Sequence, residues 1–337
     1  MTHPITKSFV VIEVGQFFFS QLLIELIIKR HVQKVLYGCK ISYNNVYGAK
    51  KKMKYLLEEF KSLFSTIIVF LFITSAFIEG SMVPTPSMEN TILTGDRLFI
   101  NKFVFGSSTP SYIPFTNFEL PHLKLPPLRD PNRNEIIVFR FPGDQNQLVD
   151  DAVEFWVKRC VALPGDTIEI RNKVVYVNNK KSPIPADINY FNKTIRKAGI
   201  RDNRIFPPNS NWNGDNYGPL VIPKRGDVVE VNINNIKKWE TLINREFGKK
   251  TVNTSGKEII INGKITKKYT IQQDYYFMVG DNRDNSLDSR FWGFVPRKNI
   301  VGTPIMIFWS WDSNIPFTRP LDLLSSIRFN RIAKLVK

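Results

Sequence analysis

One serine of the chain, Ser87, lies between two prolines on its N-terminal side and a Gly-Asp turn, in the stretch PTPSMENTILTGD, nine residues after an uncharged run that ends at Ile78. A serine hydroxyl is a weak nucleophile unless a neighbouring group takes its proton. The histidines are His3, His31 and His122; the first two precede the apolar run, and His122 lies in the irregular, proline-rich stretch LPHLKLPPL. A Ser-His-Asp triad would have to depend on that third histidine, so the better candidates for a base are lysine and carboxylate side chains.

Lys158 is the most suggestive candidate for the base. It lies in the strand-like stretch EFWVKRCVALPGD, where a period of two places Trp156, Lys158 and Cys160 on one apolar face and Arg159 on the other. A lysine acts as a base only when neutral, and lowering its pKa from about 10.4 to about 8 requires destabilising the charged form by about 3 kcal/mol. Burial on an apolar face would do so. The alternative is a lysine at a sheet edge that extends its amine to solvent.

The third stretch whose side chains could take part in a reaction is MVGDNRDNSLDSRFWGFVP. In it the segment from Asp281 to Asp288 is polar at all but one position. It is not an EF-hand calcium loop, because the sixth and twelfth positions are Ser and Trp where Gly and Glu are needed. A polar turn between two hydrophobic strands remains. In it Ser286 and Asp288 are available to an amine, and Arg283 and Arg290 are available to carboxylates.

The elements that must position these residues are mainly β-strands. The chain has 337 residues, of which 43% are hydrophobic and 13% aromatic, enough for a sizeable core. After Met82 the pattern alternates or runs in β-branched and aromatic residues between Gly-Asp and Asn-Gly turns. The segments expected to form strands are DRLFINKFV, NEIIVFRFP, DTIEIRNKVVYVN, GDVVEVNI, KEIIINGKI and YTIQQDYYFMVGD.

Residues 79–337 are expected to form one β-rich domain with loop-rich insertions near 107–133 and 180–270. The first insertion contains six prolines between Pro110 and Pro131, which predicts an extended surface excursion. At the C-terminus, DLLSSIRFNRIAKLVK predicts a short basic amphipathic helix that lies on the domain or on an anionic lipid surface.

Residues 62–78 are predicted to form a transmembrane helix. Leu63 to Ile78 gives 16 residues without charge, which is about 24 Å of helix against a hydrocarbon core of about 30 Å. Between Lys29 and Lys61 the chain has nine basic residues against two glutamates. The positive-inside rule therefore places this loop in the cytoplasm and everything after Ile78 outside.

The N-terminal segment 1–61 contains a second apolar stretch, 8–28, which carries Glu13 and Glu25. The cost of two carboxylates in a span is close to what its apolar residues return, so a first membrane helix and an interfacial helix are both open. Met53 could also be the true start of the protein.

Charge and cysteine usage exclude several classes of function. The net charge is +17, but the basic residues are scattered among acids and no nucleic-acid-binding signature is present, so no nucleic-acid partner is expected. The two cysteines, Cys39 and Cys160, fall on opposite sides of the predicted membrane, which excludes a disulfide framework and a CxxC zinc site. No metal and no cofactor are expected.

The three stretches together resemble the bacterial type I signal peptidases, which cut leader peptides from exported proteins with a Ser-Lys dyad. PTPSM, VKRCVALPGD and GDNRDNSLDSRFWGFVP match the successive boxes of that family in order. The resemblance implies a mainly β, antiparallel catalytic domain of signal-peptidase type with one or two N-terminal transmembrane helices. It also implies location at the bacterial cytoplasmic (inner) membrane with the catalytic domain on the periplasmic side. The implied partners are preproteins with signal peptides and the lipid bilayer.

Carried over position by position, the resemblance makes Ser87 the nucleophile and Lys158 the general base. Ser286 would orient the Lys158 amine, and the Thr85 hydroxyl would complete an oxyanion hole with the Ser87 N–H. The positions of the family's supporting ion pairs hold Asp281, Asp288, Arg159 and Arg290. The positions that line the pockets for small residues at −1 and −3 hold Val83, Met88, Ile92, Trp156 and Val157. Two positions depart from the family: Asn90 stands where proline is usual, and Pro86 where glycine or another small residue is frequent.

Two other functions are compatible with parts of this sequence. A self-cleaving Ser-Lys peptidase of repressor type shares the chemistry, but the membrane helix and the lack of a DNA-binding segment disfavour it. A non-enzymatic, membrane-tethered β-domain for protein interaction is disfavoured because Ser87, Lys158 and Ser286 are all present.

Overall fold

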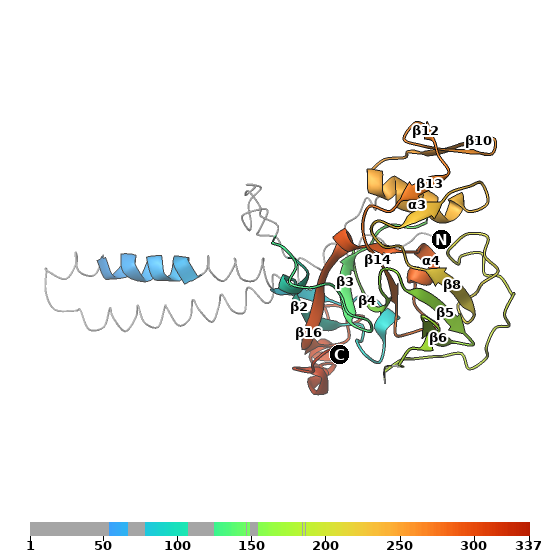
Figure 1. Cartoon of the computed structure of the whole chain (residues 1–337). Coiled ribbons are helices and arrows are strands. Elements are labelled where there is room, and N and C mark those ends of the chain that lie inside the picture. The colour runs from blue at the N-terminus through green and yellow to red at the C-terminus, as the bar shows by residue number, and fades with distance from the viewer. Residues whose placement is uncertain are drawn as a thin grey trace, which may run out of the picture.

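The computed structural model describes residues 54–66, 78–106, 125–145, 147–148, 154–183, 185 and 187–337 (Figure 1). Residues 54–66 are helical. Within the described ranges, no helix combines the length and the apolar character that a membrane crossing needs. The apolar stretch 8–28 and most of the span predicted at 62–78 lie outside these ranges, and Ile78 is the first residue of strand β1.

The central element is a seven-stranded sheet with the order β1-β2-β16-β3-β4-β14-β15, and every neighbouring pair is antiparallel. The fold is therefore mainly β and antiparallel, as predicted. Strands distant in sequence become neighbours, because the C-terminal strand β16 inserts between β2 and β3. The strands are β1 (Ile78–Met82), β2 (Asp96–Asn101), β3 (Ile136–Arg140), β4 (Phe155–Ala162), β14 (Tyr275–Val279), β15 (Val295–Pro296) and β16 (Ile300–Ser310).

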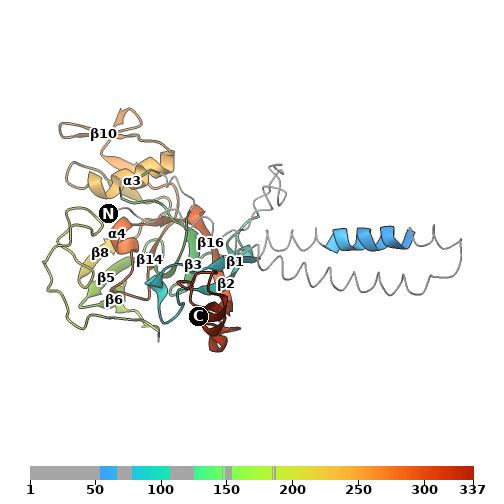
Figure 2. The same ribbon diagram turned by 180° about the vertical axis from the view of Figure 1, so that it is seen from behind.

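Three smaller sheets extend the domain, with the orders β7-β6-β5-β8, β10-β11-β12 and β13-β9. Figures 1 and 2 show the β10–β12 hairpins at one end of the domain and the C-terminus at the other. The strands are β5 (Thr167–Arg171), β6 (Val174–Val177), β7 (Lys180–Lys181), β8 (Tyr217–Val221), β9 (Val228–Glu230), β10 (Val252–Ser255), β11 (Glu258–Ile261), β12 (Lys264–Ile265) and β13 (Lys268–Thr270).

The region 180–270, expected to be loop-rich, also contains a regular helix, α3 (Ile236–Phe247). Its apolar residues Ile236, Trp239 and Ile243 are buried, and Gly248 ends the helix with φ of 67°. Apolar residues at this spacing, followed by a glycine in the left-handed conformation, are typical of a helix. The helix was not predicted because the neighbouring segments are rich in β-branched residues.

The two faces of the central sheet are both covered near β4. Val157 packs against a cluster that includes Val83 and Met88, whereas Cys160 belongs to a second cluster that includes Trp292. The strand is thus buried on both sides, and a charged residue in it loses contact with water.

The C-terminal segment is helical over only part of its length, and it contacts strand β2 of the central sheet. Helix α5 (Pro320–Ser325) has six residues, and a single 3-10 turn, Phe329–Arg331, follows it. The predicted amphipathic helix is wrong in extent because the Arg331 guanidinium turns inward to the Asp96 carboxylate, at 2.6 Å.

Candidate active site

Ser87 lies in a short 3-10 helix, Pro86–Met88, in the loop between β1 and β2. Pro86 is its first residue, where the fixed φ of proline fits and a missing N–H costs nothing. Met88 is buried in the core, and Ser87 itself is 8% exposed. The departure from the family at Pro86 therefore fits the local structure.

The structure brings Ser87 and Lys158 together. Lys158 Nζ lies 2.6 Å from Ser87 Oγ, although 71 residues separate the two positions. The amine also donates to the carbonyl of Val157 at 3.2 Å. Lys158 is 3% exposed, and burial lowers its pKa to about 8 against the opposing charges of Asp288 and Asp281. The amine can therefore lose its proton near neutral to mildly alkaline pH.

Asp281 joins β4, the strand of Lys158, to the loop that carries Ser87. It accepts from Arg159 Nε at 2.8 Å and Nη2 at 2.6 Å, and from Thr91 Oγ1 at 2.6 Å. All three side chains are buried. The contact with Arg159 follows from the pairing of β14 with β4, which places Val279 opposite Arg159 just before the polar turn begins.

The polar turn also forms hydrogen bonds to the backbone of Pro86 and Ser87. The Asn282 backbone N–H donates to the Ser87 carbonyl at 3.1 Å, and its side-chain amide donates to the Pro86 carbonyl at 3.0 Å. Sequence analysis did not single out Asn282, since an amide in a polar turn carries no distinguishing signal.

Asp288 and Arg290 close the other end of the turn. The Asp288 carboxylate accepts from the Gly280 backbone and from Arg290 Nε and Nη2, at 2.8–3.1 Å. Burial alone would raise the pKa of Asp288, but the charge of Arg290 holds it below its ordinary value. Arg290 also donates to the Arg283 carbonyl, so the pair fixes the path of the turn.

Gly280 is a site residue that the sequence did not reveal. A Cβ at this position would lie 2.2 Å from Ser286 Oγ and 2.5 Å from the Ser87 carbonyl oxygen. Glycine is needed here because the turn approaches the backbone of Ser87 too closely for a side chain. A Gly-Asp dipeptide in the sequence does not indicate such a close approach.

The hydrogen bond expected from Ser286 to the Lys158 amine is absent from the described part of the chain. Ser286 Oγ is buried and has no hydrogen-bond partner among the described residues. The Thr85 hydroxyl lies 3.4 Å from Ser87 Oγ.

A cleft of about 400 Å³ opens over the dyad. Four of the predicted pocket residues line it, namely Val83, Met88, Trp156 and Val157. Ile92 does not: it is completely buried in the core with Leu98 and Ile100. The cleft is also lined by residues that sequence analysis did not name, including Met82, Pro84, Phe155 and Leu287. We call this space the catalytic cleft.

No grouping of three or more His, Cys, Asp or Glu side chains suited to a metal ion occurs in the described ranges. The groups that the structure brings together at the site are a buried hydroxyl, an amine whose pKa is lowered by burial, and the surrounding hydrogen-bond donors.

Comparison with known proteins gives consistent results. A family model described as signal peptidase, peptidase S26, matches residues 56–309. Signal peptidase I of Buchnera aphidicola (subspecies Acyrthosiphon pisum) is 32% identical over 310 residues, covering 88% of each chain. Signal peptidase I of Rickettsia bellii is 30% identical, covering 82% of this chain and 84% of the relative. Signal peptidase I of Pseudomonas aeruginosa is 28% identical, covering 77% and 76%.

Proposed function

The chain belongs to the signal peptidase family as a signal peptidase I, a serine endopeptidase, and we propose that Ser87 and Lys158 carry its chemistry. The single observation that supports this assignment most strongly is the 2.6 Å contact between Ser87 Oγ and Lys158 Nζ in a buried environment. The substrates are preproteins whose signal peptides are removed.

The reaction has two stages. The Ser87 hydroxyl donates its proton to the neutral Lys158 amine as its oxygen attacks the scissile carbonyl, and the resulting ammonium then protonates the leaving amine. The mature protein departs and the leader remains as an ester on Ser87. Lys158, neutral again, takes a proton from water, whose oxygen attacks the ester. As the ester bond to Ser87 breaks and the leader is released as its carboxylic acid, the Lys158 ammonium returns the proton to Ser87 Oγ, so that both groups regain their starting state.

The negative charge that develops on the carbonyl oxygen needs donors placed in advance. The Thr85 hydroxyl and the Ser87 backbone N–H serve as these donors. The supporting observation is the position of Thr85 Oγ1, 3.4 Å from Ser87 Oγ, at the N-terminal end of the 3-10 helix.

Five further side chains hold the dyad in place. Asp281 with Arg159, and Asp288 with Arg290, act as buried ion pairs that position the turn and β4. Ser286 orients the Lys158 amine during the reaction; the supporting observation is that Ser286 Oγ is buried and that a Cβ on Gly280 would meet both it and the Ser87 carbonyl oxygen.

The substrate binds to the catalytic cleft in an extended conformation. Apolar walls formed by Val83, Met88, Trp156 and Val157 suit small side chains at −1 and −3 of the leader. An extended peptide gains affinity from backbone hydrogen bonds to an adjacent strand, while alternate side chains enter the pockets.

Residues 62–78 anchor the enzyme in the bacterial cytoplasmic membrane, with the catalytic domain on the periplasmic side. Ser87 follows Ile78 by nine residues, so it lies no more than roughly 30 Å from the membrane exit at about 3.3 Å per residue. A leader whose apolar core occupies the bilayer presents its cleavage site at that height.

The assignment is tested on a leader-bearing precursor with the full-length enzyme in detergent micelles. Ser87→Ala and Lys158→Ala should each abolish cleavage, measured by the appearance of the mature product on gels. Near-native cleavage by either variant would show that another pair of groups performs the reaction.

A further inference from the structure

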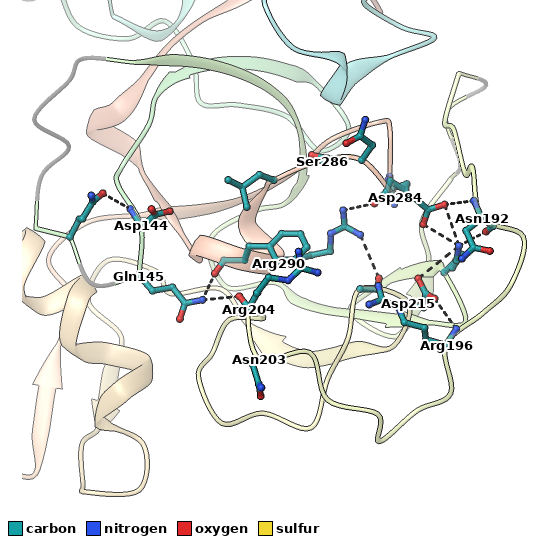
Figure 3. A pocket seen from close by; sticks show the side chains of 17 residues that line it. Asp144, Gln145, Asn192, Arg196, Asn203, Arg204, Asp215, Asp284, Ser286 and Arg290 are labelled. Carbon is teal, nitrogen blue, oxygen red and sulfur yellow. Dashed lines mark hydrogen bonds and ion pairs between the residues drawn. The ribbon is translucent and has the colours of Figure 1, made fainter. Parts of the chain in front are cut away.

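A second and larger cavity, of about 1090 Å³, adjoins the catalytic cleft. The two spaces share Asn285 and Leu287 of the polar turn as wall residues. In Figure 3, Asp284, Asp215 and Arg196 lie on one side of this cavity and Gln145 and Arg204 on the other. We call it the arginine cavity, because its walls include four arginines, Arg196, Arg204, Arg283 and Arg290.

Three of these arginines are neutralised by carboxylates. Arg290 is paired with Asp288 at 2.8 Å. Arg196 and Arg204 both lie on Asp202, at 3.4 Å and 2.8 Å. The lysine of the cavity, Lys173, is likewise paired, with Asp284 at 3.1 Å.

Arg283 is different. It is 6% exposed, and its guanidinium group has no carboxylate partner and no hydrogen bond from Nε among the residues that the structure describes. Burial lowers the pKa of this guanidinium from its ordinary value, although the charges of Asp281 and Asp288 act to raise it. A small void of about 10 Å³ also borders Arg283, but only the arginine cavity has room for a peptide side chain.

The wall residues relate the two spaces to the proposed membrane anchor. Ser81 and Met82 of β1 line the catalytic cleft, and β1 begins where the proposed anchor ends. A leader held in the bilayer would therefore enter the cleft along β1. The chain that follows the scissile bond would then leave Ser87 across Asn285 and Leu287, the residues shared with the arginine cavity.

We propose that the arginine cavity binds the first residues of the mature part of the precursor, and that Arg283 binds an Asp or Glu side chain there. This inference rests on the proposed function. It makes Arg283 a specificity-determining residue on the side of the scissile bond opposite the leader, and it defines the preferred substrates as precursors with an acidic residue shortly after the cleavage site.

The experiment compares precursor peptides that differ in one residue, with Asp, Asn or Lys placed in turn at each of the early mature positions. The full-length enzyme in detergent micelles should cleave the Asp peptide with a kcat/KM roughly 10-fold above that of the Asn peptide at one position or two neighbouring positions. Arg283→Gln should remove this ratio, whatever its activity on the Asn peptide. Equal kcat/KM for Asp, Asn and Lys at every position would overturn the inference.

Arg97 offers a matched control. It is also 6% exposed and has an unpartnered Nε among the described residues, but it lies on β2 and lines neither cavity. Arg97→Gln should keep the Asp-over-Asn ratio. Loss of the ratio in both variants would assign it to the overall charge of the enzyme and would also overturn the inference.

A second measurement does not depend on the folding of the Arg283 variant. A precursor peptide with a photoreactive side chain at the preferred mature position is bound to the full-length Ser87→Ala enzyme and irradiated. Labels should map to the walls of the arginine cavity, and labels confined to other segments would contradict the proposal. Failure of the native enzyme to cleave any of the peptides would instead refute the proposed function itself.

Discussion

Arg159 and Asp281, 122 residues apart, form a buried two-point ion pair that fastens the strand of Lys158 to the turn that supports Ser87. Because Asp281 also accepts from Thr91, the nucleophile loop, β4 and the polar turn meet at one carboxylate. The position of the dyad thus depends on a contact that involves neither member of it.

Removing one partner of this pair should be costly. Arg159→Ala leaves the Asp281 carboxylate buried without its cation, so we expect the free energy of unfolding to fall by about 3–5 kcal/mol. Urea denaturation followed by tryptophan fluorescence measures the loss. The control is Arg171→Ala: its pair with Glu169 is solvent-exposed, and its removal should leave the stability nearly unchanged, because solvent screens an exposed pair. Equal effects of the two substitutions would contradict the structural role of Asp281.

The activity should rise with pH through the pKa of Lys158, which burial lowers to about 8. The base works only when neutral, so kcat/KM should increase about tenfold per pH unit below that value and reach a plateau above it. Lys158→Arg should be inactive at every pH, since arginine cannot release its proton. A pH profile that is flat between 6 and 9 would exclude a lysine base.

The lowered pKa of Lys158 also affects the free energy of unfolding. A salt-bridged lysine stabilises the folded protein at low pH, whereas the buried Lys158 destabilises it there. The folded pKa of Lys158 lies below its unfolded value of 10.5, so the unfolded state binds more protons and folding becomes more favourable as pH rises between about 8 and 10.5. At pH 7 the full cost of the buried ammonium is present. Lys158→Met should therefore stabilise the protein at pH 7 by about 3 kcal/mol, and thermal unfolding should show this gain shrinking at pH 10.

Gly280→Ala should damage catalysis by displacement. The added Cβ would lie 2.5 Å from the Ser87 carbonyl oxygen, so the turn or the nucleophile segment must move, and we expect kcat to fall at least about 100-fold. The control is Gly199→Ala, where φ is +82° and no atom lies within 4 Å. It should lose about 1 kcal/mol of stability but keep its kcat, which separates backbone strain from disruption of the site.

Ser286→Ala tests the proposed orienting role. The Ser286 hydroxyl makes no hydrogen bond to the described residues, so its removal should leave the melting temperature unchanged or slightly raised. If the hydroxyl orients the Lys158 amine, kcat should fall by about 10- to 100-fold and the alkaline rise of the pH profile should shift. Native kcat with a native profile would remove Ser286 from the mechanism.

Several features were predicted correctly from the sequence because they depend on local pattern. Alternation along EFWVKRCVALPGD places Lys158 and Arg159 on opposite faces of β4, where they contact Ser87 and Asp281 respectively. The β-branched and aromatic runs predicted a mainly β fold. Features that depend on contacts between elements distant in the sequence were missed or predicted wrongly. They are the burial of Ile92 in the core, the close approach at Gly280, and the contact of Arg331 with Asp96 beyond the short C-terminal helix.

The sequence by itself determined the chemical types at the site: a hydroxyl without a histidine partner, a lysine in an apolar strand, and a polar turn rich in arginine and aspartate. Only the tertiary structure decided how these groups meet. Antiparallel pairing of β14 with β4 brings the turn beside the strand of Lys158, and the Asn282 N–H then holds the carbonyl of Ser87 against it. The physical reason is that side-chain periodicity is a local property of the backbone, whereas desolvation of an amine requires neighbours that the chain supplies from distant positions.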